Sequence, residues 1–426
     1  MGPEGRTERS KQLSQPTPGA APLPISGYKN NVLVPLLDLK AQYATIQDQI
    51  AGAIGRVLES QQFILGEEVK AFEDEVAAYC GTRHAVGCAS GSDAILLGLM
   101  ALGVGPGDEV ICPPYTFFST AGSIVRLGAV PVFVDIDPVT YNVDPQEVRA
   151  AAARCRRLKA IMPVHLYGQA ADLEALLGLG AELGVPIVED AAQAIGGRDA
   201  QGVGVGSRGT LGFFSFFPTK NLGGYGDGGL VTTNDGGLAE RIAKLRVHGE
   251  TSRYHHGFVG LNSRLDALQA AVLRVKLSHL ERWHEARHRN ADVYDEAFRS
   301  AGAATSQSPL TAGGLPLRTP YRPKPPARHI YNQYVIRVGA EIRDDLREHL
   351  QEKGVGTAIY YPLPLHRQAC FADLGVGEGE LPHSEAAARE TLALPIYPEL
   401  TPEQLGHVAQ TVIEFVSRPA PVSRTG

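Results

Sequence analysis

The stretch GFFSFFPTKNLGGYGDGG, residues 212–229, is the part of the sequence that decides which fold and which chemistry we expect. Its four phenylalanines predict a buried strand, and Lys220 follows that strand directly in a glycine-rich turn. A lysine among glycines ordinarily lies in a solvated loop. The aromatic strand before Lys220 favours an apolar setting instead. A lysine beside apolar walls loses part of its proton affinity, so it can act as a nucleophile and a base.

Short apolar runs alternate with helical patterns before this stretch, and one more run closes it. The runs are AVGCAS, EVICPP, VPVFVDI, KAIMPVHL, VPIVED and GGLVTT, which begin at residues 85, 109, 130, 159, 185 and 228. Continuous apolar runs joined by helices predict buried parallel strands connected by βαβ crossovers. We therefore expect an α/β fold with a mostly parallel central sheet and helices on both faces. In such sheets functional residues gather at the carboxyl ends of the strands.

The two ends of the chain follow other patterns. Helical patterns cover residues 36–60, residues 67–80 up to Gly81, and a long stretch from about 262 to 300. The Pro- and Gly-rich residues 308–327 are typical of a linker or surface loop, and a strand pattern (YNQYVIRV) and two helical ones (RDDLREHLQEKG and SEAAARETLAL) follow. The predicted organisation is a disordered extension (1–30), a large domain (31–285), a small α+β domain (286–416) and a disordered tail (417–426).

Composition excludes several classes of function. The chain has 426 residues and a formal net charge of -6, with no long basic run, so we expect no nucleic-acid partner. Its five cysteines form no CxxC pair, which fits a reducing compartment better than a disulfide framework. The first residues lack an apolar signal core, and no apolar stretch approaches the ~20 residues that span a bilayer. We expect a cytoplasmic protein without a membrane partner.

A short turn, Ser90-Gly91-Ser92-Asp93, lies between an apolar run and a helical pattern. A strand, a tight glycine turn and a helix N-terminus leave backbone N–H groups that suit a phosphate, and the hydroxyl of Ser92 adds a donor. Serine at this place also caps helices, and by itself capping is the simpler interpretation. Both alternatives remain open on this motif alone.

The apolar run VPIVEDAAQA, residues 185–194, ends in a carboxylate. Asp190 at the end of a strand could accept a charged hydrogen bond from a protonated ring nitrogen, as in pyridoxal 5′-phosphate (PLP) enzymes. A helix-capping aspartate is an equally good interpretation of this residue alone. Gln193, three residues on, would reach the same ligand or bond to the neighbouring loop.

The order of these motifs is more informative than any one of them, because Lys220 lies thirty residues beyond Asp190 and Asp190 about a hundred beyond the glycine turn. From about Val34 to Gln404 the chain resembles the DegT/StrS family of fold-type I, PLP-dependent sugar-nucleotide aminotransferases. The passages that carry the resemblance are VPLLDLKAQY, FILGEEVKAFE, SGSDAILLGL, GPGDEVICPPYTFFST, PVFVDIDPVTYNVDP, VHLYGQ, VEDAAQA, FSFFPTKNLGGYGDGG, VGLNSRLDALQAA, YNQYVIR and YYPLPLHRQ.

The resemblance implies a role for each matching residue. Lys220 matches the Schiff-base lysine and Asp190 the partner of the pyridine nitrogen. Cofactor contacts are implied for Gly91, Ser92 and Ser215 (phosphate), Phe117 (stacking on the ring) and Gln193 (beside the ring hydroxyl). Asn262 matches an asparagine that reaches the phosphate of the neighbouring subunit, so the resemblance implies a homodimer with a shared active site. Substrate contacts are implied for Arg264, Tyr331, Tyr360 and His366, although a surface ion pair is an equally good interpretation of Arg264.

The reaction implied is transfer of an amino group from L-glutamate to a keto-sugar linked to dTDP or UDP. GLNSRLDALQAA, with RYHH before it, resembles most the branch that aminates a 3-keto group. Two alternatives are a PLP-dependent sugar dehydratase, in which histidine replaces the lysine, and a non-catalytic PLP-binding regulator of the same fold. Gly204-x-Gly206-x-x-Gly209 precedes a strand pattern, so we reject it as a dinucleotide fingerprint. We expect no metal site at the adjacent His255 and His256.

Overall fold

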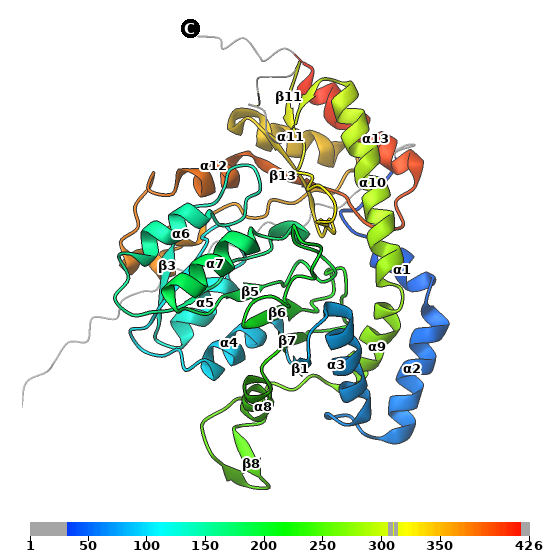
Figure 1. The fold of residues 1–426 in the computed structure, drawn as a ribbon. Helices are drawn as coiled ribbons and strands as arrows, with labels where there is room; N and C mark the ends of the chain where they lie inside the picture. The colour runs from blue at the N-terminus through cyan, green and yellow to red at the C-terminus, as the bar shows by residue number, and fades with distance from the viewer. Residues whose placement is uncertain (1–31, 306–309, 311–313, 419–426) are drawn as a thin grey trace, which may run out of the picture. The chain divides into compact units, whose positions relative to one another are not determined.

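The central sheet of this computed structural model, which describes residues 32–305, 310 and 314–418, is built from strands β1 to β7 (Figure 1). Two sets of strands, in the orders β1-β7-β6-β5 and β3-β2-β4, are joined where Ile161 and Val164 pair with Ile187 and Asp190. The bounds are His84–Cys88 (β1), Glu109–Cys112 (β2), Val130–Phe133 (β3), Leu158–Ile161 (β4), Val188–Asp190 (β5), Leu211–Ser215 (β6) and Gly229–Thr233 (β7).

All neighbouring pairs in this sheet are parallel except the two that involve β7, which runs antiparallel to β1 and to β6. The prediction of a mostly parallel sheet is confirmed. The prediction that GGLVTT is a parallel strand is wrong. The chain between β6 and β7, residues 216–228, contains no helix, so it turns back directly instead of crossing over.

Adjacent phenylalanines of β6 show how the two faces of the sheet are covered. Phe213 packs with α4 (Gly91–Ala101), α5 (Ser119–Arg126) and α8 (Gly236–Leu245). Phe214 packs on the other side with α2 (Gln47–Ser60), α3 (Glu67–Cys80) and α9 (Ala267–Leu277). α6 (Pro145–Ala152) and α7 (Leu173–Leu183) pack over β2 and β4. Because successive strand residues point to opposite faces, helices cover both faces, as predicted.

The N-terminal helical pattern, predicted as one stretch, forms two helices. α1 (Leu39–Ala44) begins at Asp38, whose carboxylate accepts from the backbone N–H groups of Lys40 and Ala41, and α2 starts after an interruption at Thr45 and Ile46. α3 ends at Gly81, which has a positive φ of 76°, as the sequence predicts.

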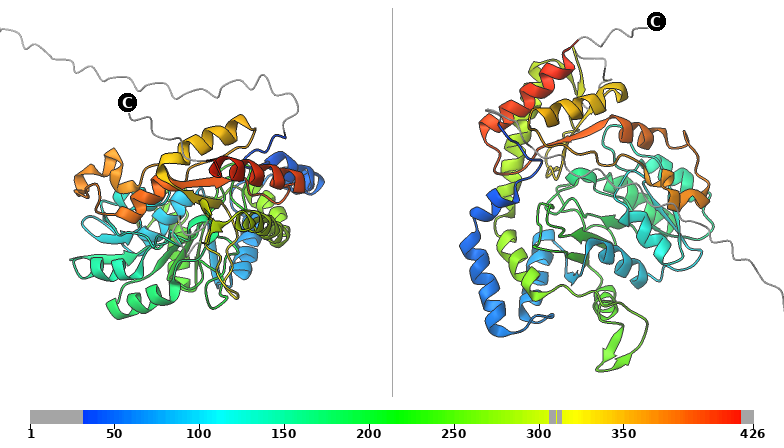
Figure 2. Two further views of the ribbon diagram at one scale, coloured as in Figure 1. Left: turned by 90° about the horizontal axis from the view of Figure 1, so that it is seen from above. Right: turned by 180° about the vertical axis from the view of Figure 1, so that it is seen from behind.

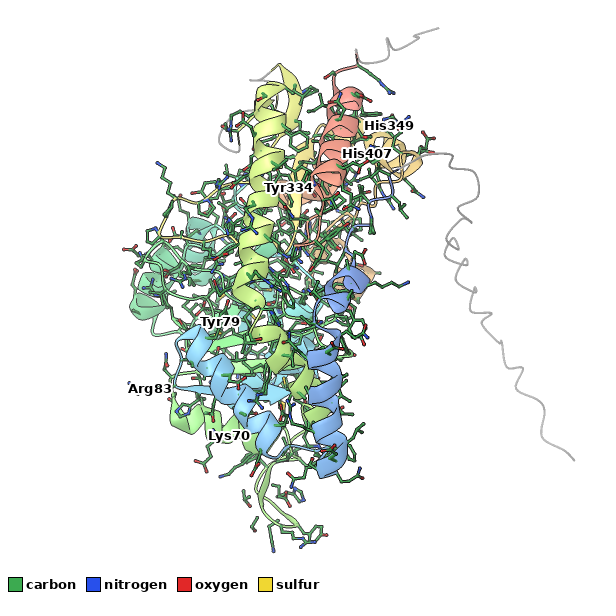
Figure 3. All side chains as sticks on the ribbon, turned by 90° about the vertical axis from the view of Figure 1, so that its right-hand side faces the viewer. Lys70, Tyr79, Arg83, Tyr334, His349 and His407 are labelled. Atoms are coloured by element: carbon green, nitrogen blue, oxygen red, sulfur yellow. The ribbon has the colours of Figure 1, made fainter. Side chains whose placement is uncertain are left out.

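The C-terminal part contains a second sheet in the order β10-β11-β12-β13, flanked by helices. Its strands are Ala303–Ala304 (β10), Leu315–Arg318 (β11), Tyr334–Val338 (β12) and Thr391–Leu394 (β13), and its helices are Leu280–Ser300 (α10), Ala340–Glu352 (α11), Pro382–Glu390 (α12) and Pro402–Val416 (α13). In Figure 3, Tyr334 lies beside α10, and its ring centre is 5.0 Å from that of Tyr294.

Three predictions for this part need correction. The long helix predicted over about 262–300 is two helices, because the chain breaks at Ser278 and His279 between α9 and α10. The predicted loop 308–327 contains β11, which pairs with β12. The helix predicted over SEAAARETLAL stops at Glu390, because all four residues of β13 are buried and pair with β12.

The predicted domain boundary at residues 285 and 286 falls inside α10 and stays a prediction. The predicted disordered segments, 1–30 and 417–426, lie outside the described residues, except for Ser417 and Arg418, which follow α13. A small hairpin, β8 (Glu250–Ser252) and β9 (His255–His256), projects beyond α8 (Figures 1 and 2). In the part of the chain that the structure describes, no helix is both long and apolar enough to cross a membrane.

Candidate active site

The glycine turn after β1 meets the end of β6. Gly229 pairs with both Cys88 and Ser215, so the ends of β1 and β6 lie on either side of β7. A Cβ added to Gly91 would lie 2.6 Å from the Cβ of Ser215, and one added to Gly229 would lie 2.2 Å from the carbonyl oxygen of Ser90. Only glycine fits at these two positions, and the N-terminus of α4 therefore lies against Ser215.

Both interpretations of the SGSD turn are compatible with its geometry. The hydroxyl of Ser90 accepts from the backbone N–H of Asp93 at 3.1 Å, so Ser90 caps α4. Ser92 lies one turn further in, and its hydroxyl bonds to that of Ser119 at the start of α5. The N-termini of α4 and α5 thus meet beside Ser215, which is a suitable place for a phosphate group.

Asp190 is the last residue of β5, and its side chain is almost fully buried. One carboxylate oxygen accepts from the hydroxyl of Thr120 at 2.8 Å, and the other accepts from the backbone N–H of Ala192 at 3.2 Å. Burial raises the pKa of Asp190, while these donors and the nearby Lys220 and His165 act in the opposite direction. A cationic partner would therefore strengthen the ionised form of Asp190.

Thr120 is a site residue that the sequence analysis missed. It is fully buried near the start of α5, and its hydroxyl also bonds to that of Thr116 at 3.1 Å. Thr116 precedes α5, which begins at Ser119, so no helical spacing in the sequence points to this pair of threonines.

Lys220 lies half-buried in the turn after β6, where its backbone N–H donates to the carbonyl of Phe217 at 2.9 Å. Burial lowers the pKa of Lys220 to about 8, and the negative charge of Asp190 opposes this shift. At pH 7 about a tenth of such a lysine is neutral, compared with less than a thousandth at the ordinary pKa. The amine is thus prepared to act as a nucleophile.

Gln193, three residues after Asp190, bonds to two tyrosines. Its side-chain oxygen accepts from the backbone N–H of Tyr167 at 2.7 Å, and its nitrogen donates to the hydroxyl of Tyr361 at 2.9 Å. The Tyr361 ring centre lies 6.1 Å from that of Phe117, whose side chain is exposed. Tyr361 was not among the predicted site residues, although it is the residue of the YYPLPLH segment that contacts Gln193 and Phe117.

Tyr360, the neighbour that the sequence analysis selected, has a different environment. Its carbonyl accepts from the buried hydroxyls of Tyr115, at 2.7 Å, and Tyr167. Its side chain lines a small pocket together with Thr219 and Asn332. Because Thr219 precedes Lys220, Tyr360 remains a candidate for a substrate contact.

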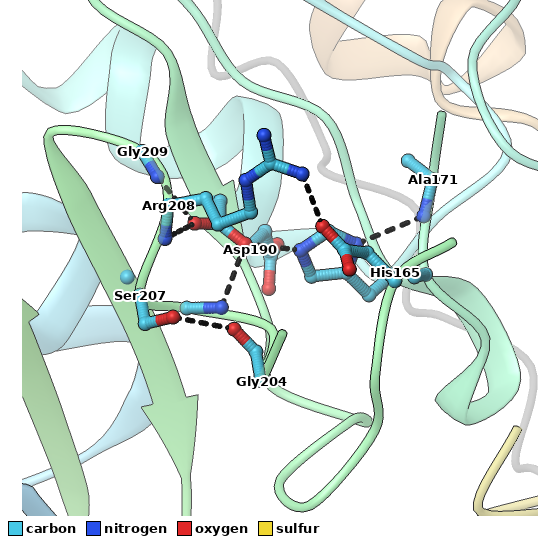
Figure 4. Close-up of polar contacts among 12 residues, drawn as sticks. His165, Ala171, Asp190, Gly204, Ser207, Arg208 and Gly209 are labelled. Carbon is cyan, nitrogen blue, oxygen red and sulfur yellow. Dashed lines mark hydrogen bonds and ion pairs between the residues drawn. The ribbon is translucent and has the colours of Figure 1, made fainter. Parts of the chain in front are cut away.

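Glu189 explains the glycine pattern that we rejected as a dinucleotide fingerprint, and three of its partners, His165, Arg208 and Gly209, are labelled in Figure 4. This fully buried carboxylate accepts from the backbone N–H groups of Gly206 (2.6 Å), Arg208 (3.0 Å) and Gly209 (2.6 Å). It also lies 2.8 Å from Nε2 of His165. Because Nδ1 of His165 accepts from the N–H of Ala171, Nε2 carries the proton and donates to Glu189. The backbone N–H of His165 in turn donates to the carbonyl of Asp190 at 2.9 Å. The hydrogen bonds around Glu189 therefore also help to fix the backbone of Asp190.

Four predicted residues remain: Asn262, Arg264, Tyr331 and His366. Asn262 is exposed, and its backbone pairs with that of Val247; Arg264 is half-buried. Tyr331 is 1% exposed in the C-terminal core, where its ring stacks on that of His329 at 4.2 Å. His366 is buried against Glu385, with Nε2 3.2 Å from the carboxylate. Burial of these last two side chains leaves the predicted substrate contacts of Tyr331 and His366 without support.

Several named proteins are similar to this chain over about nine tenths of its length. A protein named pleiotropic regulatory protein from Geobacillus stearothermophilus is 49% identical over 90% of this chain and 98% of its own length. UDP-N-acetyl-3-dehydro-alpha-D-glucosamine 3-aminotransferase from Acidithiobacillus ferrooxidans is 42% identical over the same shares. dTDP-3-amino-3,4,6-trideoxy-alpha-D-glucose transaminase from Streptomyces venezuelae is 43% identical over 90% of this chain and 97% of its own length.

The fold has close counterparts among solved structures. The crystal structure of S. venezuelae DesV superposes with a TM-score of 0.85 at 41% identity, covering 91% of this chain and all of that chain. The family model described as the DegT/DnrJ/EryC1/StrS aminotransferase family matches residues 44–413. The chain therefore belongs to the DegT/DnrJ/EryC1/StrS aminotransferase family, which confirms the fold class, the transamination chemistry and the PLP dependence expected from the sequence.

Proposed function

We propose that this protein moves an amino group from L-glutamate to carbon 3 of a keto-sugar linked to UDP or dTDP. The observation that carries the proposal is the meeting of Lys220, Asp190 and the N-terminus of α4 at the carboxyl ends of the central strands. The names of the relatives that are 42% and 43% identical, both enzymes for 3-amino sugars, support the nucleotide and the position. A cytoplasmic location remains a prediction.

The side chains of the site fit PLP in chemistry and in order. Lys220 would hold the cofactor through its amine, and Asp190 would face the ring nitrogen. Phe117 and Gln193 would lie against the ring, while the α4 N-terminus, Ser92 and Ser215 would bind the phosphate. When bound, PLP supplies an electron sink for the bonds around the amino-acid carbon.

The chain's own contribution is binding, orientation and proton transfer. The Lys220 amine, with its pKa near 8, can take a proton at Nζ from one carbon and return it to another near neutral pH. Asp190 stays charged when it faces a protonated ring nitrogen, and Thr120 fixes the direction of its carboxylate. The phosphate contacts at the α4 N-terminus would orient the ring relative to Lys220.

We also propose a homodimer whose two active sites each take a residue from both subunits. Asn262 is exposed on this chain, as a side chain that acts on a partner must be. Phe117, Phe217 and Tyr225, near the Lys220 turn, are 56%, 49% and 43% exposed, and a partner subunit would cover such apolar rings. Tyr254 and Val259, at and after the β8–β9 hairpin, are more exposed still.

Two alternatives make different demands on position 220. A dehydratase of this fold would have histidine there, and a regulator without catalysis would have no need of a lysine with a lowered pKa beside Asp190. Lys220 thus favours transamination over both.

The visible spectrum of the purified protein with PLP tests the proposal. We expect a yellow band that bleaches on addition of L-glutamate, and a cofactor mass on Lys220 after borohydride reduction; Lys220→Ala should show neither. UDP- and dTDP-linked 3-keto and 4-keto sugars would then be compared as acceptors for the amino group. Bleaching by L-glutamate without turnover of any 3-keto sugar would overturn the substrate, and absence of the covalent cofactor would overturn the role of Lys220.

A further inference from the structure

A second lysine, Lys276, is buried behind the turn that carries Lys220. It lies on α9, its residue is 2% exposed, and its Nζ donates to the carbonyl of Gly223 at 2.7 Å. The same Nζ lies 4.5 Å from the ring centre of Tyr225. Among the described residues no carboxylate forms an ion pair with Lys276, so the Gly223 carbonyl and the Tyr225 ring are its partners.

Burying a lysine at this position costs free energy, because its charged amine loses contact with water. Burial lowers the pKa of Lys276 to about 8, which means that the surroundings oppose its charge. A leucine or methionine on this face of α9 would avoid that penalty, since its neighbours Ala270, Ala271 and Leu273 are buried core residues. We therefore look for the role of Lys276 in the hydrogen bond that its amine makes to Gly223.

The Lys276 amine binds the part of the Lys220 turn that leads back to β7, residues 221–228, which we call the return arm. The backbone N–H of Phe216 donates to Gly228 at 2.8 Å, and that of Gly224 donates to Phe216 at 2.8 Å, so the segment from 216 to 228 closes on itself. Gly223 lies against Pro218, because a Cβ added to Gly223 would be 2.3 Å from the Pro218 carbonyl oxygen. A shift of Gly223 would therefore be transmitted to Pro218 and to Lys220, two residues further on.

α9 forms a second hydrogen bond to the return arm. The side-chain oxygen of Gln269 accepts from the backbone N–H of Tyr225 at 2.8 Å. Gln269 precedes Lys276 by seven residues, which is two turns of helix, so both side chains leave the same face of α9. Two polar side chains from one rigid helix thus fix consecutive parts of the arm.

We propose that Lys276 is a positioning residue for transamination, which fixes the Gly223 carbonyl and through it the place of the Lys220 amine. The proposal rests on the role proposed above for Lys220. Lys276 acts on the turn and has no contact of its own with the reacting groups.

Lys276→Met, which is one atom shorter than lysine, keeps an unbranched side chain at this buried position and loses the donor; it tests this in the PLP-loaded protein. The matched control is Lys244→Met, which removes a partly exposed lysine paired with the exposed Glu240 on α8. We expect amide hydrogen exchange of residues 221–226 to become at least tenfold faster in Lys276→Met. We also expect kcat to fall about tenfold with KM for L-glutamate within twofold, and the pH midpoint of the visible band to move. Borohydride should still trap the cofactor on Lys220.

Wild-type exchange, kcat and pH midpoint in Lys276→Met would overturn the proposal, as would a loss of thermal stability without any change in these three quantities. If Lys276→Met does not fold, Lys276→Gln replaces it, because its shorter amide cannot span the distance to Gly223; the same changes are expected and the same outcome refutes them. Lys220→Ala separates the two proposals. If it retains the trapped cofactor, the proposed role of Lys220 fails, whereas wild-type behaviour of Lys276→Met alone removes only the role of Lys276.

Discussion

Replacing Glu189 by glutamine removes one buried negative charge and leaves the volume of the side chain almost unchanged. Each carboxylate oxygen of Glu189 accepts two hydrogen bonds, one from Arg208 and Gly209 and the other from His165 and Gly206. A glutamine presents one oxygen and one NH₂ group. Whichever way it is oriented, the NH₂ group faces two donors, so two of the four bonds are lost. His165 cannot adapt by moving its proton, because its other nitrogen already accepts from Ala171.

The size of the effect follows from those two bonds. A hydrogen bond to a charged group contributes about 1.5–3 kcal/mol, so the loss of two lowers the free energy of unfolding by about 3–6 kcal/mol. With an unfolding entropy of roughly 2.1 cal/mol/K per residue over 426 residues, the melting temperature should fall by about 3–7 °C. The loss is concentrated behind Asp190, so cofactor release should become faster as well.

Thermal melts at one protein concentration and one scan rate, with and without PLP, measure this effect. Glu182→Gln is the control, because Glu182 pairs with Arg149 where both side chains are more than half exposed, and its melting temperature should stay within about 1 °C of the wild type. If Glu189→Gln has the same melting temperature as this control, the four hydrogen bonds to Glu189 do not contribute the stability calculated above.

Three further predictions concern the proposed active site. Thr120→Val removes a charge-assisted bond to Asp190, and PLP retention in equilibrium dialysis should weaken about tenfold; unchanged retention would contradict the contact. In cofactor-free protein, the rate at which PLP becomes covalently trapped on Lys220 should rise with pH around a midpoint near 8, because only the neutral amine attacks; a midpoint near the ordinary lysine pKa would show that burial has no such effect. Coexpression of Lys220→Ala with Asn262→Ala should restore about a quarter of the wild-type activity, since random pairing leaves one intact site in each mixed dimer; no recovery would mean that Asn262 acts within its own subunit.

The parts of the site that the sequence predicted are those defined by local order along the chain. Asp190 and Lys220 each end or follow a strand, and Gly91 lies in a strand–turn–helix passage, so the sheet brings them to one edge. Thr120 was missed because its contact with Asp190 crosses seventy residues and depends on how α5 packs. Local periodicity carries no information on that packing.

Adjacent residues were the hardest to assign. Tyr360 and Tyr361 are indistinguishable in composition, and only the folded chain shows that the Tyr361 hydroxyl meets Gln193. Tyr331 is buried in the C-terminal core, and its predicted substrate contact stays a prediction. The antiparallel direction of β7 was missed because strand direction depends on the connection, and a glycine-rich turn predicts no particular length of crossover.

The course of α10 has a consequence for cutting the protein into pieces. Leu280 and Trp283, at its start, belong to the core that also contains α9, whereas Tyr294 and Phe298, near its end, belong to the C-terminal core. A single helix of 21 residues is thus shared by two cores along a length of about 31 Å. Fragments divided at the predicted boundary, between residues 285 and 286, would carry six and fifteen residues of this helix, each with an uncovered apolar stripe. They should aggregate when expressed separately and form soluble protein only when produced together, since each half supplies the surface that the other lacks.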